Sequence, residues 1–206
     1  DNAEAKAGKK LTQAEETQKI IKIVENFLRK KKLVCYGGTA INNILPTEDQ
    51  FYDKNIELPD YDFFSHNALN DAKALADIYA KNNYSDVEAK SGIHHGTYKV
   101  YVNFIPVADI TYIPKDLFNS ISKESVKVAG ILYAPPNYLR MAMYLELSRP
   151  QGDVSRWEKV LKRLILLNKN YPMRNPKCHH VDFMRSFENK NKNDMHDIYM
   201  TVRDSI

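Results

Sequence analysis

The sequence has few cysteines and no long apolar run. Its 206 residues include only two cysteines, Cys35 and Cys178. Two are too few for a disulfide framework, so a reducing compartment is the simpler expectation. No stretch approaches the roughly 18 to 20 apolar residues of a membrane-spanning helix, and residues 1–10 are polar and lysine-rich, unlike a secretion signal. These features exclude a disulfide-stapled scaffold and predict a protein with no membrane partner.

The chain also lacks a large surplus of charge of either sign. Its formal net charge is +4, which permits contact with phosphates but does not establish nucleic-acid binding. Basic residues cluster at 29–32 and 156–169, and a solvated face explains the first cluster equally well. With 43% hydrophobic and 11% aromatic residues, the composition is that of an ordinary globular protein.

Hydrophobic periodicity predicts an α/β (α+β) fold in which a small mixed sheet is flanked by helices. We expect a polar N-terminal segment over 1–10, one domain over 11–170, and a polar tail or the start of a further domain over 171–206. The expected helices lie at 12–31, 39–45, 67–82, 135–147 and 154–168. The expected strands lie at 33–36, 60–65, 84–90, 98–104, 107–113 and 126–133.

Two aspartates, Asp60 and Asp62, are separated by one residue in the expected strand at 60–65. Alternate residues of a strand project from the same face, so the two carboxylates point together while Tyr61 points away. Like charges this close repel unless a cation lies between them, and carboxylate oxygens are ligands that Mg²⁺ and Mn²⁺ prefer. The alternative is a strand end with two solvated carboxylates, which explains most isolated Asp-x-Asp pairs.

A third aspartate, Asp109, lies among apolar residues of the expected strand at 107–113. A carboxylate in an inner strand needs a partner, because desolvating it alone costs several kcal/mol. A buried arginine or lysine could be that partner. A metal ion shared with Asp60 and Asp62 is the more economical hypothesis, because it explains all three carboxylates at once.

A Gly-Gly pair, Gly37 and Gly38, follows the expected strand at 33–36 and precedes a helix. Residues without side chains let a phosphate approach the backbone N–H groups at a helix start, and Thr39 adds a hydroxyl there. A tight connection without any ligand is the common alternative. Because the pair precedes the two aspartates by about twenty residues, phosphate binding and metal binding combine in one hypothesis.

Together these pieces resemble the polymerase-β-type nucleotidyltransferase superfamily, which has Gly-Gly-Thr after a strand, Asp-x-Asp on the next strand and a third Asp on a later strand. The sequence of residues 36–45, 58–64 and 108–112 is similar to the poly(A) polymerase catalytic subunit of poxvirus-like and giant DNA viruses. The resemblance covers about residues 10–170. It implies that the domain over 11–170 is a nucleotidyltransferase core.

The resemblance implies template-independent transfer of AMP from ATP to the 3′-hydroxyl of a single-stranded RNA, with release of pyrophosphate. Asp60, Asp62 and Asp109 match the family's three carboxylates and would hold two Mg²⁺ or Mn²⁺ ions. It further implies a second copy or a processivity subunit as a partner. The implied location is the host cytoplasm, a viral factory or the virion.

The same resemblance assigns residues to the nucleotide. Gly37, Gly38 and Thr39 would contact the β and γ phosphates, and Arg156 or Lys159 would neutralise charge on the leaving pyrophosphate. Such polymerases carry further domains for RNA and nucleotide binding, and 206 residues leave little room for them. We therefore expect either a fragment or a natural minimal version.

Two other functions stay open at this point. A minimal nucleotidyltransferase would use the same site to modify a protein or a small molecule. An inactive nucleotide-binding subunit would keep the fold without the reaction, although the presence of all three carboxylates argues against it. Transfer of label to RNA or to another acceptor discriminates between the two enzymes.

Histidines and the second cysteine give weaker signals. His94 and His95 lie between Gly92 and Gly96, where exposed turn residues are more common than ligands. Residues 178–180, Cys-His-His, have the side chains of a zinc site but lack a second matching cluster. Neither group enters the predicted site.

Overall fold

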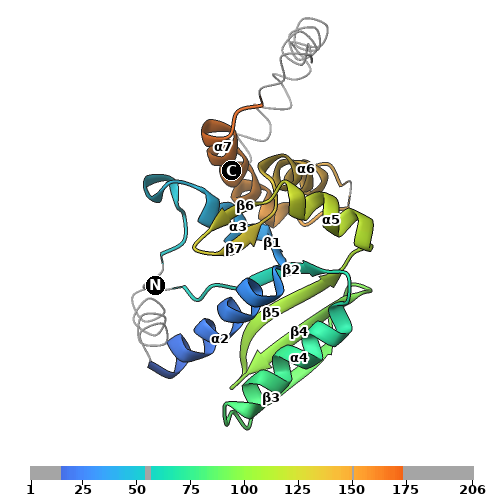
Figure 1. Ribbon diagram of the computed structural model, residues 1–206. Coiled ribbons are helices and arrows are strands. Elements are labelled where there is room, and N and C mark those ends of the chain that lie inside the picture. The colour runs from blue at the N-terminus through green and yellow to red at the C-terminus, as the bar shows by residue number, and fades with distance from the viewer. Residues whose placement is uncertain (1–14, 54–56, 150, 174–206) are drawn as a thin grey trace, which may run out of the picture. The chain divides into compact units, whose positions relative to one another are not determined.

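The core of the protein is a mixed sheet of seven strands (Figure 1). The computed structural model describes residues 15–53, 57–149 and 151–173. The strands are β1 (Val34–Tyr36), β2 (Tyr61–Ser65), β3 (Val87–Ser91), β4 (Thr97–Val102), β5 (Ile105–Tyr112), β6 (Val126–Val128) and β7 (Ile131–Tyr133). Their order is β3-β4-β5-β2-β1-β7-β6, with β2 parallel to β5, β1 parallel to β7 and the other neighbours antiparallel. The predicted mixed sheet and α/β class are confirmed.

The chain divides into two compact units, Asp1–Tyr144 and Leu145–Ile206. The first unit holds the whole sheet. The helices are α2 (Glu15–Lys31), α3 (Gly37–Ile44), α4 (Ala68–Lys81), α5 (Lys115–Lys123), α6 (Pro136–Leu147) and α7 (Trp157–Asn170). Within the described ranges, none of these helices is long and apolar enough to cross a membrane.

Helices α2 and α4 pack on one face of the sheet (Figure 1). The Phe27 ring of α2 lies 6.4 Å from the Phe63 ring of β2, centroid to centroid, and the Tyr79 hydroxyl of α4 donates to the Ile20 carbonyl of α2 at 2.8 Å. Burying each large apolar side chain contributes about 1.5–3 kcal/mol. This layer therefore fixes one face of β2 and β5, and polar residues of these strands lie on the other face.

A buried polar cluster ties the end of β2 to both of these helices. Ser65 and Asp71 are almost fully buried, and the Ser65 hydroxyl donates to Asp71 Oδ2 at 2.5 Å. Asp71 Oδ1 accepts from Lys31 Nζ at 2.9 Å, and the backbone N–H of Asn67 donates to Ser65 Oγ at 2.8 Å. Each of these buried side-chain oxygen atoms of Ser65 and Asp71 has a partner, as its burial requires.

Strands β4 and β5 form a hairpin with an irregular register. Asn103 and Phe104 join them with φ angles of +49° and +63°, the left-handed pair of a two-residue hairpin loop. The register then shifts between Val100 and Tyr101, because β5 accommodates one extra residue, Val107, as a bulge. Beyond the bulge every pairing of β4 with β5 differs by one residue from that next to the loop.

The helix after β1 differs from the prediction. We expected this helix to span 39–45 after a glycine turn, but α3 begins at Gly37, and Tyr36 stands at the N-cap without a side-chain hydrogen bond. Thr39 lies within the first turn and is buried. Thr39 does not cap the helix, because its hydroxyl donates to the Asp60 carbonyl at 2.7 Å.

Two other elements were also missed. The predicted strand at 126–133 is a hairpin of β6 and β7, in which Ala129 and Gly130 turn with φ angles of +48° and +82°. Alanine rarely adopts this conformation, so the turn carries little sequence signal. Helix α5 was not predicted, and it buries only Ile121.

Candidate active site

A row of polar and charged residues crosses one face of the sheet. Tyr36 of β1 pairs with Asp62 of β2, and Asp62 pairs with Asp109 of β5. Asp109 pairs with Lys99 of β4, and Lys99 pairs with Lys90 of β3. Residues in register on neighbouring strands project from the same face. The register therefore brings two of the predicted carboxylates together and adds a lysine beside them.

Asp60 immediately precedes β2, two residues before Asp62, and is exposed at the end of the row. Its pKa is raised, first because protein around the carboxyl group excludes water and then because of the negative charge of Asp109, with Lys99 partly opposing both effects. The charges of Asp60 and Asp109 thus act on each other. Asp62 joins these two carboxylates by its position in register with Asp109.

Lys99 is the partner of Asp109. Its Nζ donates to Asp109 Oδ2 in an ion pair, and the two side chains are 31% and 16% exposed. Burial by itself lowers the pKa of Lys99, but the hydrogen bond to Asp109 and the charges of Asp109 and Asp60 outweigh it and raise the pKa. The sequence left open that a basic residue is the partner of Asp109, and the structure shows that Lys99 is this residue. The ion pair lies beside the other two aspartates.

Gly37 lies directly against Asp62. Its φ angle is +74°, and a Cβ atom built on it would lie 2.5 Å from Asp62 Oδ2, so close that the carboxylate would have to move. The sequence suggested that a glycine here makes room for a phosphate. The structure gives a second reason, which is that the carboxylate occupies the space of the missing side chain.

Thr39 supports Asp60 through the backbone. Its hydroxyl donates to the Asp60 carbonyl at 2.7 Å, so that proton is not available to a phosphate while the bond lasts. Gly38 lies beside it in the first turn of α3, half-buried. The structure thus gives Thr39 a positioning contact that the sequence did not predict.

Tyr36 closes the row on the side of β1. Its ring stacks on Phe64, with centroids 4.0 Å apart, and its hydroxyl shares a hydrogen bond with Thr111 Oγ1 at 2.8 Å. Burial raises the pKa of Tyr36, and the nearby charges of Asp62 and Asp109 raise it further. The phenol therefore stays protonated beside the carboxylates.

The donor set fits a hard divalent cation by its chemistry, since three carboxylates are the ligands that Mg²⁺ and Mn²⁺ prefer. In the part of the chain that the structure describes, however, no three His, Cys, Asp or Glu side chains are grouped closely enough to enclose a metal ion. Asp109 turns an oxygen to Lys99 on β4, whereas Asp62 lies on β2, on the other side of β5. A metal site here requires movement of side chains.

The remaining predicted residues lie elsewhere. Arg156 and Lys159 belong to the second unit, where Arg156 Nε donates to Glu146 Oε1 at 2.8 Å and Lys159 is exposed. Their contact with pyrophosphate stays a prediction. His94 and His95 are exposed turn residues between β3 and β4, and residues 178–180 lie outside the described residues.

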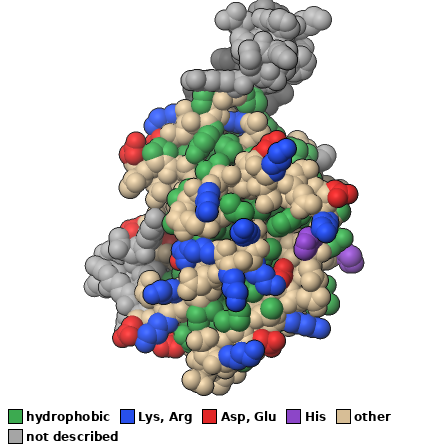
Figure 2. Space-filling view, in the orientation of Figure 1, with side chains coloured by type: hydrophobic (Ala, Val, Ile, Leu, Met, Phe, Trp, Pro, Cys, Tyr) green, Lys and Arg blue, Asp and Glu red, His purple; other side chains and the backbone are tan. Residues whose placement is uncertain are grey.

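The basic cluster at 29–32 serves largely as structure. Figure 2 shows basic side chains over α2, whose last turn carries Arg29, Lys30 and Lys31. Arg29 donates to Glu25 Oε2 at 3.1 Å and to the Ala129 carbonyl at 2.9 Å, and Lys31 pairs with Asp71. Two of the four basic residues of the cluster are thus engaged in the packing of α2.

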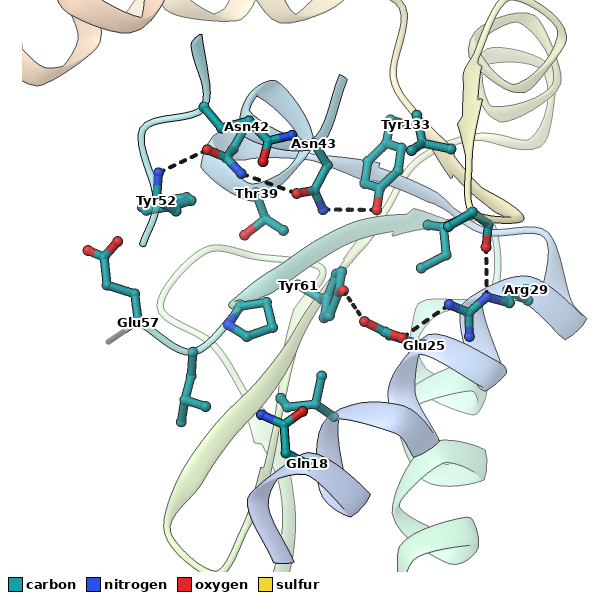
Figure 3. A pocket seen from close by; sticks show the side chains of 17 residues that line it. Gln18, Glu25, Arg29, Thr39, Asn42, Asn43, Tyr52, Glu57, Tyr61 and Tyr133 are labelled. Carbon is teal, nitrogen blue, oxygen red and sulfur yellow. Dashed lines mark hydrogen bonds and ion pairs between the residues drawn. The ribbon is translucent and has the colours of Figure 1, made fainter. Parts of the chain in front are cut away.

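A cavity of about 320 Å³ lies behind β2 (Figure 3). Tyr61, between Asp60 and Asp62 in the sequence, points into it and donates its hydroxyl to Glu25 Oε1 at 2.8 Å. Thr39 also lines this cavity. Because Tyr61 alternates with the two aspartates, the cavity opens on the helix-covered side of β2 and is not the carboxylate site.

The mixed sheet carries neighbouring aspartates on one face, and a helix that begins with glycine packs against one of them. This is the arrangement of a nucleotidyltransferase core. The chain belongs to the family described as the poly(A) polymerase catalytic subunit, whose sequence pattern matches residues 22–153. That match contains β1, α3, all three aspartates and Lys99. The predicted resemblance is confirmed.

Viral relatives support the same assignment. A protein of African swine fever virus (strain Badajoz 1971 Vero-adapted), assigned as a poly(A) polymerase catalytic subunit, is 35% identical over 173 residues, which cover 81% of this chain and 36% of the relative. A protein of Acanthamoeba polyphaga mimivirus with the same assignment is 32% identical over 162 residues, covering 77% of this chain and 27% of the relative. The chain thus spans about a third of the length of these relatives.

Solved structures share the fold. The Megavirus polyadenylate synthase superimposes with a TM-score of 0.75 at 29% identity, over 92% of this chain and 40% of the other. JHP933 from Helicobacter pylori superimposes with a TM-score of 0.50 at 16% identity, over 77% of this chain and 68% of the other. The second likeness concerns the fold alone.

Proposed function

We propose that this chain carries the catalytic core of a poly(A) polymerase, which transfers AMP from ATP to the 3′-hydroxyl of RNA and releases pyrophosphate. The observation that carries the proposal is the register of Asp62 with Asp109, beside Asp60, inside the region matched by the family. Three carboxylates on one sheet face suit a reaction in which cations bound by the protein must neutralise the charge of a triphosphate. The names of the viral relatives and of the Megavirus structure support adenylate as the transferred nucleotide, and RNA as the acceptor is part of the proposal.

Divalent cations are the cofactors that this proposal requires. Nucleotidyltransferases generally use such ions, and Asp60, Asp62 and Asp109 would hold two Mg²⁺ or Mn²⁺ ions. When bound, the ions lower the pKa of the attacking hydroxyl and neutralise charge on the phosphates. The side chains of this site then act by holding the ions at fixed positions on a rigid sheet.

The start of α3 is the part of the chain that suits the triphosphate. Helix N-terminal N–H groups attract anions, and Gly37 and Gly38 add no side chains of their own there, although the Asp62 carboxylate lies against Gly37. Thr39 contributes indirectly, because its bond to the Asp60 carbonyl holds the start of β2. Arg156 and Lys159 stay proposals for the pyrophosphate, since they belong to the second unit.

The partners and the location follow from the relatives. ATP and a single-stranded RNA 3′ end are the substrates of the proposed reaction, and the family description as a catalytic subunit implies a second subunit or a second copy. Because the relatives are proteins of large DNA viruses, we propose that the enzyme acts where viral messages are made, in the host cytoplasm, a viral factory or the virion.

Primer extension tests this function. The chain is incubated with an oligo(A) primer, Mg²⁺ or Mn²⁺ and each labelled NTP in turn, beside an Asp60→Asn, Asp62→Asn double variant and the control Asp77→Asn. Asp77 is an exposed carboxylate of α4, so its neutralisation removes charge without touching the row. Extension with ATP alone, lost in the double variant and kept in the control, is the expected result.

Two outcomes lead to other functions. Transfer of label to a protein or a small molecule instead of RNA would identify a minimal nucleotidyltransferase. Absence of both transfer and metal-dependent ATP binding would identify an inactive subunit. Either outcome would remove polyadenylation as the function of this chain.

A further inference from the structure

Asp109 has two competing neighbours on opposite sides. Lys99 reaches it from β4 and forms an ion pair with Oδ2. Asp62 stands beside it on β2, where a cation shared by the aspartates would lie. While Asp109 Oδ2 is paired with Lys99, that oxygen is not available to a cation on the other side. The position of this side chain therefore depends on which cation it meets.

The charge of Lys99 also reaches beyond Asp109. It acts on Asp60 as well, so the charge of one ammonium group affects two of the three carboxylates. Two positive charges a few ångströms apart repel strongly where water is partly excluded. A divalent ion entering among the aspartates must overcome this repulsion and detach Asp109 from its partner.

We propose that Lys99 is a built-in competitor of the divalent cation for Asp109, so that the ion alone binds weakly and binds well only together with the triphosphate. This inference rests on the metal site of the proposed function. The exchange is a displacement in which the lysine keeps its proton and no covalent bond changes. A triphosphate brings negative charge of its own, which offsets the ammonium group and supplies further oxygen ligands. Lys99 thereby couples ion binding to nucleotide binding.

The sheet offers a matched control for this proposal. Lys90 of β3 stands directly opposite Lys99 on the same face, and it is the next positive charge along the row. Its ammonium group pairs with Glu88 at 3.0 Å and lies 4.6 Å from the centre of the Tyr101 ring. It is one strand farther from Asp109, and solvent and salt screen its charge there.

The experiment is a titration of the full 206-residue chain with Mn²⁺ in the absence of nucleotide, followed by electron paramagnetic resonance and calorimetry. The variants are Lys99→Met, Lys99→Gln, Lys99→Arg and Lys90→Met. Removing the charge at Lys99 is expected to tighten Mn²⁺ binding by at least about tenfold. Lys99→Arg keeps a cation and is expected to stay near the wild type, while Lys90→Met changes affinity by less than about twofold.

Controls separate this inference from the proposed function. Mn²⁺ binding must disappear in the Asp60→Asn, Asp62→Asn variant, which locates it at the aspartates and needs neither ATP nor RNA. Circular dichroism identifies any variant that fails to fold, and Lys99→Gln and Lys99→Met provide two independent neutral replacements. A failed primer extension with tighter Mn²⁺ binding in Lys99→Met would overturn the polymerase function and leave the competition standing.

Unchanged or weaker Mn²⁺ binding in both neutral variants would overturn the proposal. It would mean that Lys99 orients Asp109 as a ligand, holding one oxygen while the ion binds the other. Equal increases in Mn²⁺ affinity in Lys99→Met and Lys90→Met would also overturn it, because the effect would then come from the net charge of the protein and not from the position of Lys99. Binding that survives loss of Asp60 and Asp62 charge would place the ion elsewhere and overturn it as well.

Discussion

The contact between Gly37 and Asp62 makes a sharp prediction for the variant Gly37→Ala. An alanine there would have to adopt a φ angle of +74° with its Cβ atom 2.5 Å from Asp62 Oδ2. The left-handed conformation costs an alanine about 1–2 kcal/mol, and the carboxylate must in addition move by several tenths of an ångström or more. A displacement of about 1 Å in a catalytic group can cost about 100-fold in rate. The rate of Gly37→Ala should therefore fall by much more than its loss of folding stability explains.

Gly130 provides the matched control for this prediction. It has a similar φ angle of +82°, but a Cβ atom there would lie 3.4 Å from the Arg29 side chain, an ordinary contact. Gly130→Ala should therefore lose a similar free energy of unfolding, about 1–2 kcal/mol, and keep its activity.

Urea unfolding and the initial rate of primer extension, measured on both variants at a temperature where both are folded, test the prediction. The expected result is a destabilisation of at least about 1–2 kcal/mol in both variants, with a rate loss of about 100-fold in Gly37→Ala alone. Rates that stay at the wild-type level in both variants would refute the reasoning, because Asp62 would then tolerate the added methyl group or have no part in the reaction. A rate lost equally in both would attribute the effect to stability.

Three further predictions concern the support of the site. Asp71→Ala breaks the buried cluster with Ser65 and Lys31 and should lower the free energy of unfolding by about 2 kcal/mol, measured by urea titration; a change within the error would contradict the cluster's role. Thr39→Val removes the hydrogen bond to the Asp60 carbonyl and should lower the rate of extension about tenfold at a cost of about 1 kcal/mol in stability, whereas an unchanged rate would mean that the bond does not position Asp60. The pKa of Asp60 is raised on folding by desolvation and by Asp109, so the folded state binds this proton more tightly and the wild type loses stability as pH rises through that raised pKa. Asp60→Asn should therefore have the higher melting temperature at pH 7, with the difference shrinking as pH falls through the carboxylate range, and a lower melting temperature at pH 7 would contradict the sign.

Elements with strong periodicity could be predicted from the sequence. Helices α2 and α4 carry apolar residues at helical spacing along one side, and β2 and β5 carry β-branched and aromatic residues between turn signals. Helix α5 could not be predicted, because it buries a single residue and gains little from packing. The predicted domain boundaries at 10 and 170 stay a prediction.

Part of the candidate site could likewise be predicted from the sequence, and part could not. The residue types and spacing of Asp60, Asp62 and Asp109 indicate a common face, since alternation along a strand is a local property that the sequence carries. Lys99 could not be found in this way. The sequence indicated that a basic residue could accompany Asp109, but which one it was depends on the pairing of two strands, and the contacts of Gly37 and Thr39 depend on how α3 meets β2.

The bulge at Val107 has a consequence for how this site responds to changes in chain length. Next to the loop, Val102 pairs with Ile105, and continuation of that register would set Lys99 opposite Ala108. The one extra residue sets it opposite Asp109 instead. An insertion or deletion of one residue in this hairpin would thus separate the lysine from the aspartate without altering either of them. The ion pair therefore depends on the number of residues in the hairpin as much as on their identity.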